Sequence, residues 1–138
     1  MNSRFVEAIR GAFVADAASM GTHWIYDPAE MAKTLTSLTQ PEFRDPPTPK
    51  YYSGKDFPGH YERKGQLSPY GEQLRFVTEY VAKGTKFTGA SMSTAFLDFI
   101  QSFGGRPDSA MKAFVKNMEE GKVWPDCGAD DSEGTLSQ

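Results

Sequence analysis

The sequence predicts an all-α protein, and three of its features carry that prediction. Apolar residues recur at three- and four-residue steps in five separate segments, which is the spacing of an amphipathic helix. Proline, glycine and short polar residues that favour helix ends stand between these segments. No segment shows the alternation of apolar and polar residues that is typical of a strand. We therefore expect one helical domain over residues 1–138, with a single long loop at about residues 40–68.

The first predicted helix runs from about Arg4 to Trp24, and its apolar positions are Phe5, Ile9, Ala12, Phe13, Ala17, Met20 and Trp24. Alanine and glycine make one side of this helix small, so other backbones can approach it closely. We therefore expect Asp16 to lie between packed elements. A carboxylate in such a place needs hydrogen-bond partners, and Ser19 or a donor from a distant loop would supply them.

A second, shorter helix is predicted after Asp27-Pro28, where a capping residue precedes a proline that suits the first turn. Met31, Leu35 and Leu38 supply its apolar face, and Pro41 ends it. The following segment, to about Ser68, has neither a helical nor a strand period. A loop of this length is unusual in a compact domain. Its aromatic residues favour an ordered, site-forming loop over a disordered one: Phe43, Tyr51, Tyr52, Phe57 and Tyr61.

Three more helices are predicted in the second half of the chain. The third begins after Ser68-Pro69 and ends at about Lys83, before Gly84. The fourth covers about 88–103 and is closed by Gly104-Gly105, and the fifth covers 107–120 and is closed by Gly121. Their apolar faces are broad and would normally pack against further helices: Phe96, Phe99, Phe103, Phe114 and Met118. If these faces are exposed, we expect the chain to self-associate.

Charge and composition exclude several classes of partner. The chain has 15 basic and 18 acidic side chains, a net charge of -3 and no block of like charge, so it offers no footprint for a nucleic-acid backbone. No stretch approaches the roughly 18 apolar residues of a membrane span, and no signal peptide is recognisable. Cys127 is the single cysteine, which excludes an internal disulfide and fits a reducing compartment. These observations predict a cytoplasmic protein without nucleic-acid or membrane partners.

Three segments carry a resemblance to a known family. They are His23-Trp24-Ile25-Tyr26-Asp27, Ser68-Pro69-Tyr70-Gly71-Glu72-Gln73 and Gly128-Ala129-Asp130-Asp131-Ser132-Glu133-Gly134. In their order and spacing they make the chain resemble the N-terminal part of the ADP-ribosylglycohydrolase family, in particular the branch with the J-type crystallins of jellyfish lenses. The resemblance implies an orthogonal helical bundle that is incomplete here, because the family domain is considerably longer. It also implies ADP-ribose or an ADP-ribosylated substrate as the ligand.

Active members of this family cleave the glycosidic bond between ADP-ribose and its acceptor with two magnesium ions. The resemblance places the family's glutamate ligand at His23 and its Thr-Asp-Asp-Thr run at Pro69, Tyr70, Gly71 and Glu72. A later Asp-x-Asp-Thr motif has no counterpart up to Gln138. Magnesium prefers oxygen ligands in near-octahedral geometry, whereas imidazole suits zinc, copper or iron. Because only Glu72 keeps a carboxylate, we expect no metal site and no two-magnesium chemistry.

The candidate site residues follow from these positions. Asp16 and Glu72 are the candidate catalytic carboxylates. The candidates for a ligand-binding cleft are His23, Trp24, Tyr26, Asp27, Ser68, Tyr70, Gln73, Asp130 and Asp131.

Each candidate also has a structural interpretation. For Asp16 we favour a carboxylate bonded to its neighbours over a catalytic base. The His23-Trp24 pair either stacks on an adenine or ribose or anchors the long loop, and both interpretations stay open. For Asp130-Asp131 we favour a turn or helix cap over a metal pair.

Two functions from different classes are open at this point. The first is a hydrolase-family protein that acts on, or only binds, an ADP-ribosyl group without magnesium. The second is a catalytically inactive, crystallin-like structural protein. A truncated product is a third interpretation, which would expose the apolar faces of the last two helices.

Overall fold

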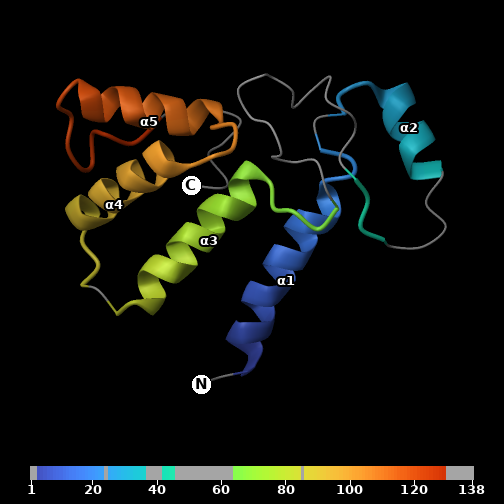
Figure 1. Cartoon of the computed structure of the whole chain (residues 1–138), viewed down its shortest axis with the longest axis horizontal. Helices are drawn as coiled ribbons and strands as arrows, with labels where there is room; N and C mark the ends of the chain where they lie inside the picture. Colours follow the sequence, from blue (N-terminus) through green and yellow to red (C-terminus); the bar gives the residue numbers. More distant parts are fainter. Residues whose placement is uncertain (1–2, 24, 37–41, 46–63, 85, 130–138) are drawn as a thin grey trace. The chain divides into compact units, whose positions relative to one another are not determined.

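The computed structural model of the chain describes residues 3–23, 25–36, 42–45, 64–84 and 86–129. These residues form five helices and no strand, so the predicted all-α fold is confirmed (Figure 1). The chain divides into two compact units, Met1–Gly71 (unit 1) and Glu72–Gln138 (unit 2). Unit 1 contains α1 and α2, and unit 2 contains most of α3 together with α4 and α5.

Helix α1 spans Ser3–Ser19, so the prediction that it continues to Trp24 is wrong. After Ser19 the chain forms turns, in which both the backbone N–H and the hydroxyl of Thr22 donate to the Ser19 carbonyl oxygen. Gly21 lies so close to the segment around Arg44 that an added Cβ would stand 2.6 Å from the Arg44 Cβ. The chain therefore turns where another segment of unit 1 crosses it, although the apolar spacing continues. Trp24 itself lies outside the described residues.

Most of the apolar face predicted for α1 is exposed. The side chains of Phe5 and Ile9 are 69% and 42% exposed, whereas Ala17 and Met20 are buried. Burial therefore begins in the last turn of α1, which is the part of the helix that carries Asp16.

Helix α2 spans Pro28–Thr36 and begins as predicted. The Asp27 carboxylate accepts hydrogen bonds from the backbone N–H groups of Ala29 and Glu30, at 2.7 and 3.1 Å. These bonds satisfy two of the N–H groups that have no partner within the helix. Of the predicted loop at about residues 40–68, the structure describes only 42–45 and 64–68, which are not helical.

Helix α3 spans Pro69–Ala82 and begins after Ser68, as the sequence predicts. The Ser68 hydroxyl accepts hydrogen bonds from the N–H groups of Tyr70 and Gly71, both at 3.2 Å. At the other end, Gly84 takes a φ of +67°, and its N–H donates to the Val81 carbonyl oxygen. A left-handed residue at this place is best supplied by glycine, so Gly84 is the predicted terminator of the helix.

Helices α4 (Gly89–Ser102) and α5 (Ser109–Glu119) differ slightly from the prediction at their ends. Helix α5 begins at Ser109 and not at Pro107, and Asp108 is its N-cap, because the Asp108 carboxylate accepts a hydrogen bond from the Met111 N–H at 2.7 Å. Helix α4 ends at Ser102 with Phe103 as its C-cap in an extended conformation, so the helix stops directly before Gly104-Gly105, as predicted. Gly121 closes α5 with a φ of +82°, as predicted.

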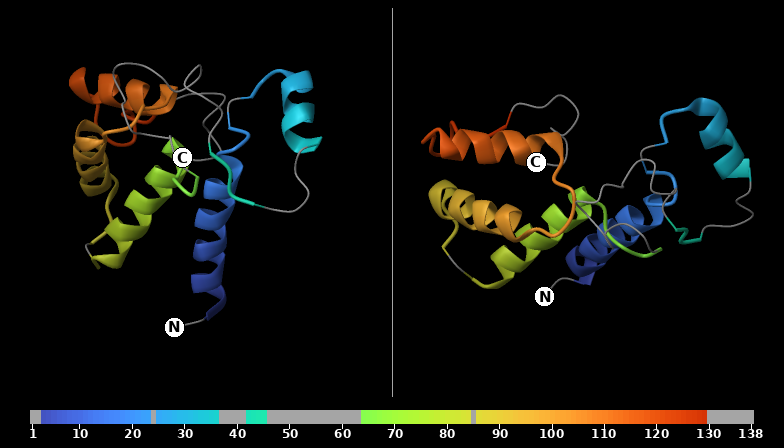
Figure 2. Two further views of the ribbon diagram at one scale, coloured as in Figure 1. Left: turned by 45° about the vertical axis from the view of Figure 1, so that its right-hand side comes forward. Right: turned by 45° about the horizontal axis from the view of Figure 1, so that its top comes forward.

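The core of unit 2 lies between α4, α5 and the segment after α5. Figures 1 and 2 show α4 and α5 side by side, joined by a short connection. Met111 is fully buried, and Ile100, Phe114 and Cys127 are buried with it. Phe76 of α3 extends this core, since its ring stacks on that of Phe99 at a centroid distance of 4.9 Å. Side chains from all three helices of unit 2 therefore pack in this core.

The sequence predicts broad apolar faces on α4 and α5. In the structure the residues of these faces pack largely on one another. Phe114 is buried, and four others are half-buried against the core: Phe96, Phe99, Phe103 and Met118. Self-association through these faces stays a prediction. No helix within the described part of the chain is long and apolar enough to cross a membrane.

Candidate functional site

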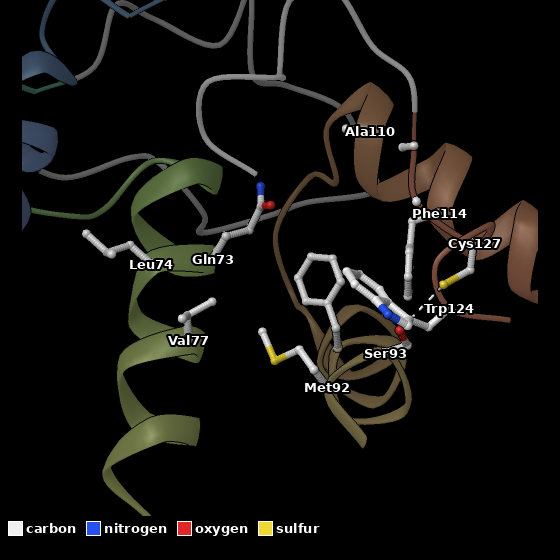
Figure 3. A pocket seen from close by; sticks show the side chains of 12 residues that line it. Gln73, Leu74, Val77, Met92, Ser93, Ala110, Phe114, Trp124 and Cys127 are labelled. Carbon is white, nitrogen blue, oxygen red and sulfur yellow. Dashed lines mark hydrogen bonds between the residues drawn. The ribbon is translucent and has the colours of Figure 1, made fainter. Parts of the chain in front are cut away.

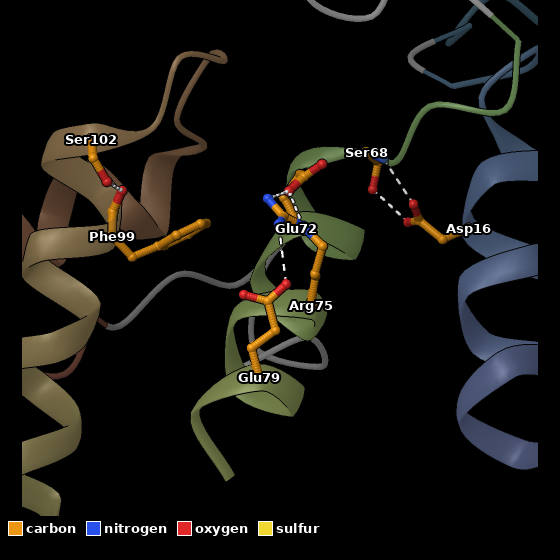
Figure 4. A network of polar contacts seen from close by, with 7 residues as sticks. All are labelled: Asp16, Ser68, Glu72, Arg75, Glu79, Phe99 and Ser102. Carbon is orange, nitrogen blue, oxygen red and sulfur yellow. Dashed lines mark hydrogen bonds and ion pairs between the residues drawn. The ribbon is translucent and has the colours of Figure 1, made fainter. Parts of the chain in front are cut away.

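The end of α1 and the start of α3 meet in unit 1 through a carboxylate and a serine. Asp16 accepts two hydrogen bonds from Ser68, one from its backbone N–H at 2.8 Å and one from its hydroxyl at 2.5 Å (Figure 4). Ser68 is fully buried and caps α3 with the same hydroxyl oxygen. Asp16 thus holds Ser68, the residue directly before α3, which stands 52 positions further along the chain. Its negative charge is also favourable at the N-terminus of a helix.

Gly71 makes this approach possible. A Cβ at this position would overlap the Asp16 Oδ2 atom and would stand 2.6 Å from Cγ of the same carboxylate. Only a residue without a side chain leaves room for Asp16 so close to the first turn of α3. The carboxylate of Asp16 therefore fills the space into which a side chain at position 71 would project.

The ring of His23 lies near this carboxylate and also contacts the ring of Tyr70. The rings of His23 and Tyr70 are tilted by 34° with their centroids 6.1 Å apart, close enough for an aromatic contact. Burial lowers the pKa of His23 below its usual value, and the nearby charge of Asp16 raises it by a smaller amount. His23 is therefore neutral near pH 7. The cluster of Asp16, His23, Ser68 and Tyr70 (the α1–α3 cluster) is the candidate site of unit 1.

Protonation of His23 is expected to destabilise the fold at acidic pH. Above the unfolded pKa of 6.5 the imidazole is neutral in both states and carries no penalty. As the pH falls below that value, the unfolded chain binds the proton first, so stability is lost until the pH passes the lower folded pKa. Chemical denaturation between about pH 7 and about pH 5 should show a smaller loss for His23→Gln than for the native chain, by at most about 1.4 kcal/mol per pH unit. Equal losses would contradict this prediction.

The donors of the α1–α3 cluster do not fit a two-magnesium site. Within the described ranges, no group of three or more His, Cys, Asp and Glu side chains is arranged to hold a metal ion. The cluster offers one carboxylate that is already bonded to Ser68, one imidazole and one phenol. A carboxylate at position 71 would collide with Asp16. Magnesium needs several oxygen donors in near-octahedral geometry, and these residues do not supply them.

The other candidates lie outside this cluster. Glu72 pairs with Arg75 on α3 at 2.5 Å, and Arg75 also reaches Glu79 at 3.2 Å (Figure 4). The hydrogen bond between Arg75 and Glu72, together with the negative charges of Glu72 and Glu79, raises the pKa of Arg75 above its usual value. Tyr26 is 77% exposed, and Asp27 caps α2. Trp24, Asp130 and Asp131 lie outside the described residues.

Gln73 lines a cavity of about 360 Å³ within unit 2, which the sequence did not reveal (Figure 3). The cavity lies between α3, α4, α5 and the segment after α5. Its other walls include Met92, Phe96, Phe114 and Trp124. The helical period correctly places several of these residues on apolar faces, but a void between faces depends on how the side chains pack. No signal in the sequence marks it.

Comparisons with known proteins point to one family. Residues 1–137 match the family model described as ADP-ribosylglycohydrolase. Crystallin J1A of Tripedalia cystophora is 31% identical over 80 residues, which cover 58% of this chain and 22% of that protein. Crystallin J1B of the same organism is 31% identical over 88 residues, which cover 63% of this chain and 24% of that protein. The match thus spans about a quarter or less of these curated relatives, and no solved structure matches the chain.

Proposed function

Because this chain belongs to the ADP-ribosylglycohydrolase family, we propose that it binds an ADP-ribosyl group at the α1–α3 cluster without magnesium. The observation that carries this proposal is the contact between the rings of His23 and Tyr70, with His23 near the carboxylate of Asp16. By the resemblance, His23 and Tyr70 occupy positions that belong to the family's metal-binding region. In this chain these positions hold two aromatic rings in contact, with His23 near the carboxylate of Asp16.

The chemistry of the cluster suits a sugar or a base better than a cation. The two rings offer faces on which an adenine or a ribose can stack. A carboxylate has about four lone-pair directions, and Ser68 uses two of them, so Asp16 can also accept hydrogen bonds from ribose hydroxyl groups. Because its imidazole is neutral, His23 can lie against the ligand without the cost of burying a charge.

Cleavage of the glycosidic bond is not part of this proposal. General acid–base catalysis needs a titratable group within reach of the proton that it moves. The two candidate carboxylates both have structural partners, since Asp16 bonds to Ser68 and Glu72 pairs with Arg75. We propose binding without hydrolysis, and release of free ADP-ribose from an ADP-ribosylated protein would contradict it.

Calorimetry on the full chain tests the binding site. We expect ADP-ribose to bind, and we expect His23→Ala and Tyr70→Ala each to weaken binding about tenfold, which corresponds to about 1.4 kcal/mol for one lost ring contact. Phe87→Ala is the matched control, because Phe87 is a 63% exposed aromatic residue of unit 2. The control should bind as the native chain does. Equal affinities of all four proteins for ADP-ribose would show that the α1–α3 cluster is not the binding site.

A crystallin-like structural role is the second candidate. It is favoured by the structural use of both carboxylates and by the similarity to two proteins named crystallins. This candidate predicts that the native chain gives no heat with ADP-ribose at any concentration.

A further inference from the structure

We propose that the cavity of unit 2 binds a neutral ring compound that carries one N–H or O–H group, through a hydrogen bond to Gln73 and contact with Trp124. This inference does not depend on the proposed function, because it concerns another unit and another class of ligand. At about 360 Å³ the cavity lies at the lower end of the range of about 300–1,000 Å³ that is usual for small-molecule sites.

The walls of the cavity select against charged ligands. None of the described residues that line it carries a charge, and most are apolar or aromatic. A phosphate or carboxylate placed here would lose its water without gaining an opposite charge, which is strongly unfavourable. The rings of Phe96, Phe114 and Trp124 instead offer faces and edges to another ring. The lining therefore favours a neutral aromatic compound and disfavours a nucleotide.

Gln73 supplies the polar anchor. It is only 4% exposed, and its Nε2 donates to the Asp108 carboxylate at 2.7 Å, which fixes the orientation of the amide. Figure 3 shows this side chain extending from α3 on the side where α4 and α5 lie. Its carbonyl oxygen is an acceptor, so it matches a ligand with an N–H or O–H group. The hydroxyl of Ser93 donates to the Gly89 carbonyl oxygen at 2.8 Å, so this second polar group does not offer its proton.

Trp124 forms a wall of the cavity that solvent can still reach. Its side chain is 60% exposed, yet its ring lies directly against Gly89, where an added Cβ would overlap it. The close contact with the first residue of α4 positions the indole, and its exposure leaves a route for the ligand. A ligand that enters would cover part of this ring.

The test uses two neutral probes, 2-naphthol and naphthalene, which differ by one hydroxyl group. Calorimetry with the full chain should show saturable binding of 2-naphthol to one site. The affinity for 2-naphthol should be at least fivefold higher than the affinity for naphthalene. In Gln73→Met this preference should disappear, because the acceptor is gone. ADP-ribose should not displace 2-naphthol, so this result is separate from the test of the α1–α3 cluster. Non-saturable uptake, or a preference that survives in Gln73→Met, would overturn the proposal.

A pair of valines on α3 gives a matched control. Val77 lines the cavity, whereas Val81, one turn later, is 60% exposed and does not. Val77→Phe should fill the cavity and lower the affinity for 2-naphthol at least tenfold. Val81→Phe should change this affinity less than twofold. Equal effects would contradict the assignment. A doubling of mass in sedimentation upon probe binding would also overturn it, because a second copy of the chain would then cover the cavity.

Discussion

Replacing Asp16 by alanine is expected to lower the free energy of unfolding by about 2–3 kcal/mol. The carboxylate accepts both donors of Ser68, and Ser68 is fully buried, so water cannot replace the lost acceptor. The same hydroxyl caps α3 through the N–H groups of Tyr70 and Gly71, so the loss also loosens the first turn of that helix. Urea denaturation followed by circular dichroism measures the effect.

Asp27→Ala is the matched control for Asp16→Ala. Asp27 also caps a helix with its carboxylate, but it is exposed, so its loss should cost only about 1 kcal/mol. A double-mutant cycle with Ser68→Ala should give a coupling energy between positions 16 and 68 of about 1 kcal/mol or more. Additive effects of Asp16→Ala and Ser68→Ala would contradict the contact between the two side chains.

Met111→Ala is expected to have the largest effect on stability, a loss of about 2–5 kcal/mol. Met111 is fully buried in the core of unit 2, beside Ile100, Phe114 and Cys127. Truncation removes contacts on all sides and leaves a void that the surrounding helices fill only in part. The loss should appear in the same denaturation experiment.

Met118→Ala, on the same helix, is the control for Met111→Ala. Met118 is only half-buried against the same core, so its truncation should cost clearly less. A larger loss for Met118 than for Met111 would show that the core of unit 2 is centred elsewhere on α5.

The helix ends that depend on local chemistry could be predicted from the sequence. Asp27 and Ser68 cap the helices that follow them, and Gly84 and Gly121 close the helices that precede them. Each of these signals acts over four residues or fewer, so it can be recognised without knowledge of the rest of the fold. The same locality explains why the all-α class follows from periodicity alone.

The features that depend on distant contacts could not be predicted. Helix α1 ends early because the segment around Arg44 crosses the chain at Gly21. The bond between Asp16 and Ser68 joins residues 52 positions apart. The sequence indicated Ser19 or a donor from a distant loop as the partner of the Asp16 carboxylate, but it did not identify Ser68, and the Ser19 hydroxyl donates to the backbone oxygen of Asp16 instead. The cavity beside Gln73 exists because several packed side chains leave space between them, which no sequence pattern specifies.

We propose that the α1–α3 cluster binds an ADP-ribosyl group and does so without magnesium. The most direct test is calorimetric titration of the full chain with ADP-ribose, once with excess magnesium chloride and once with EDTA. We expect one site with the same Kd in both conditions, and no heat when magnesium is added alone. Two magnesium ions bound per chain, together with ADP-ribose binding that requires them, would contradict the claim.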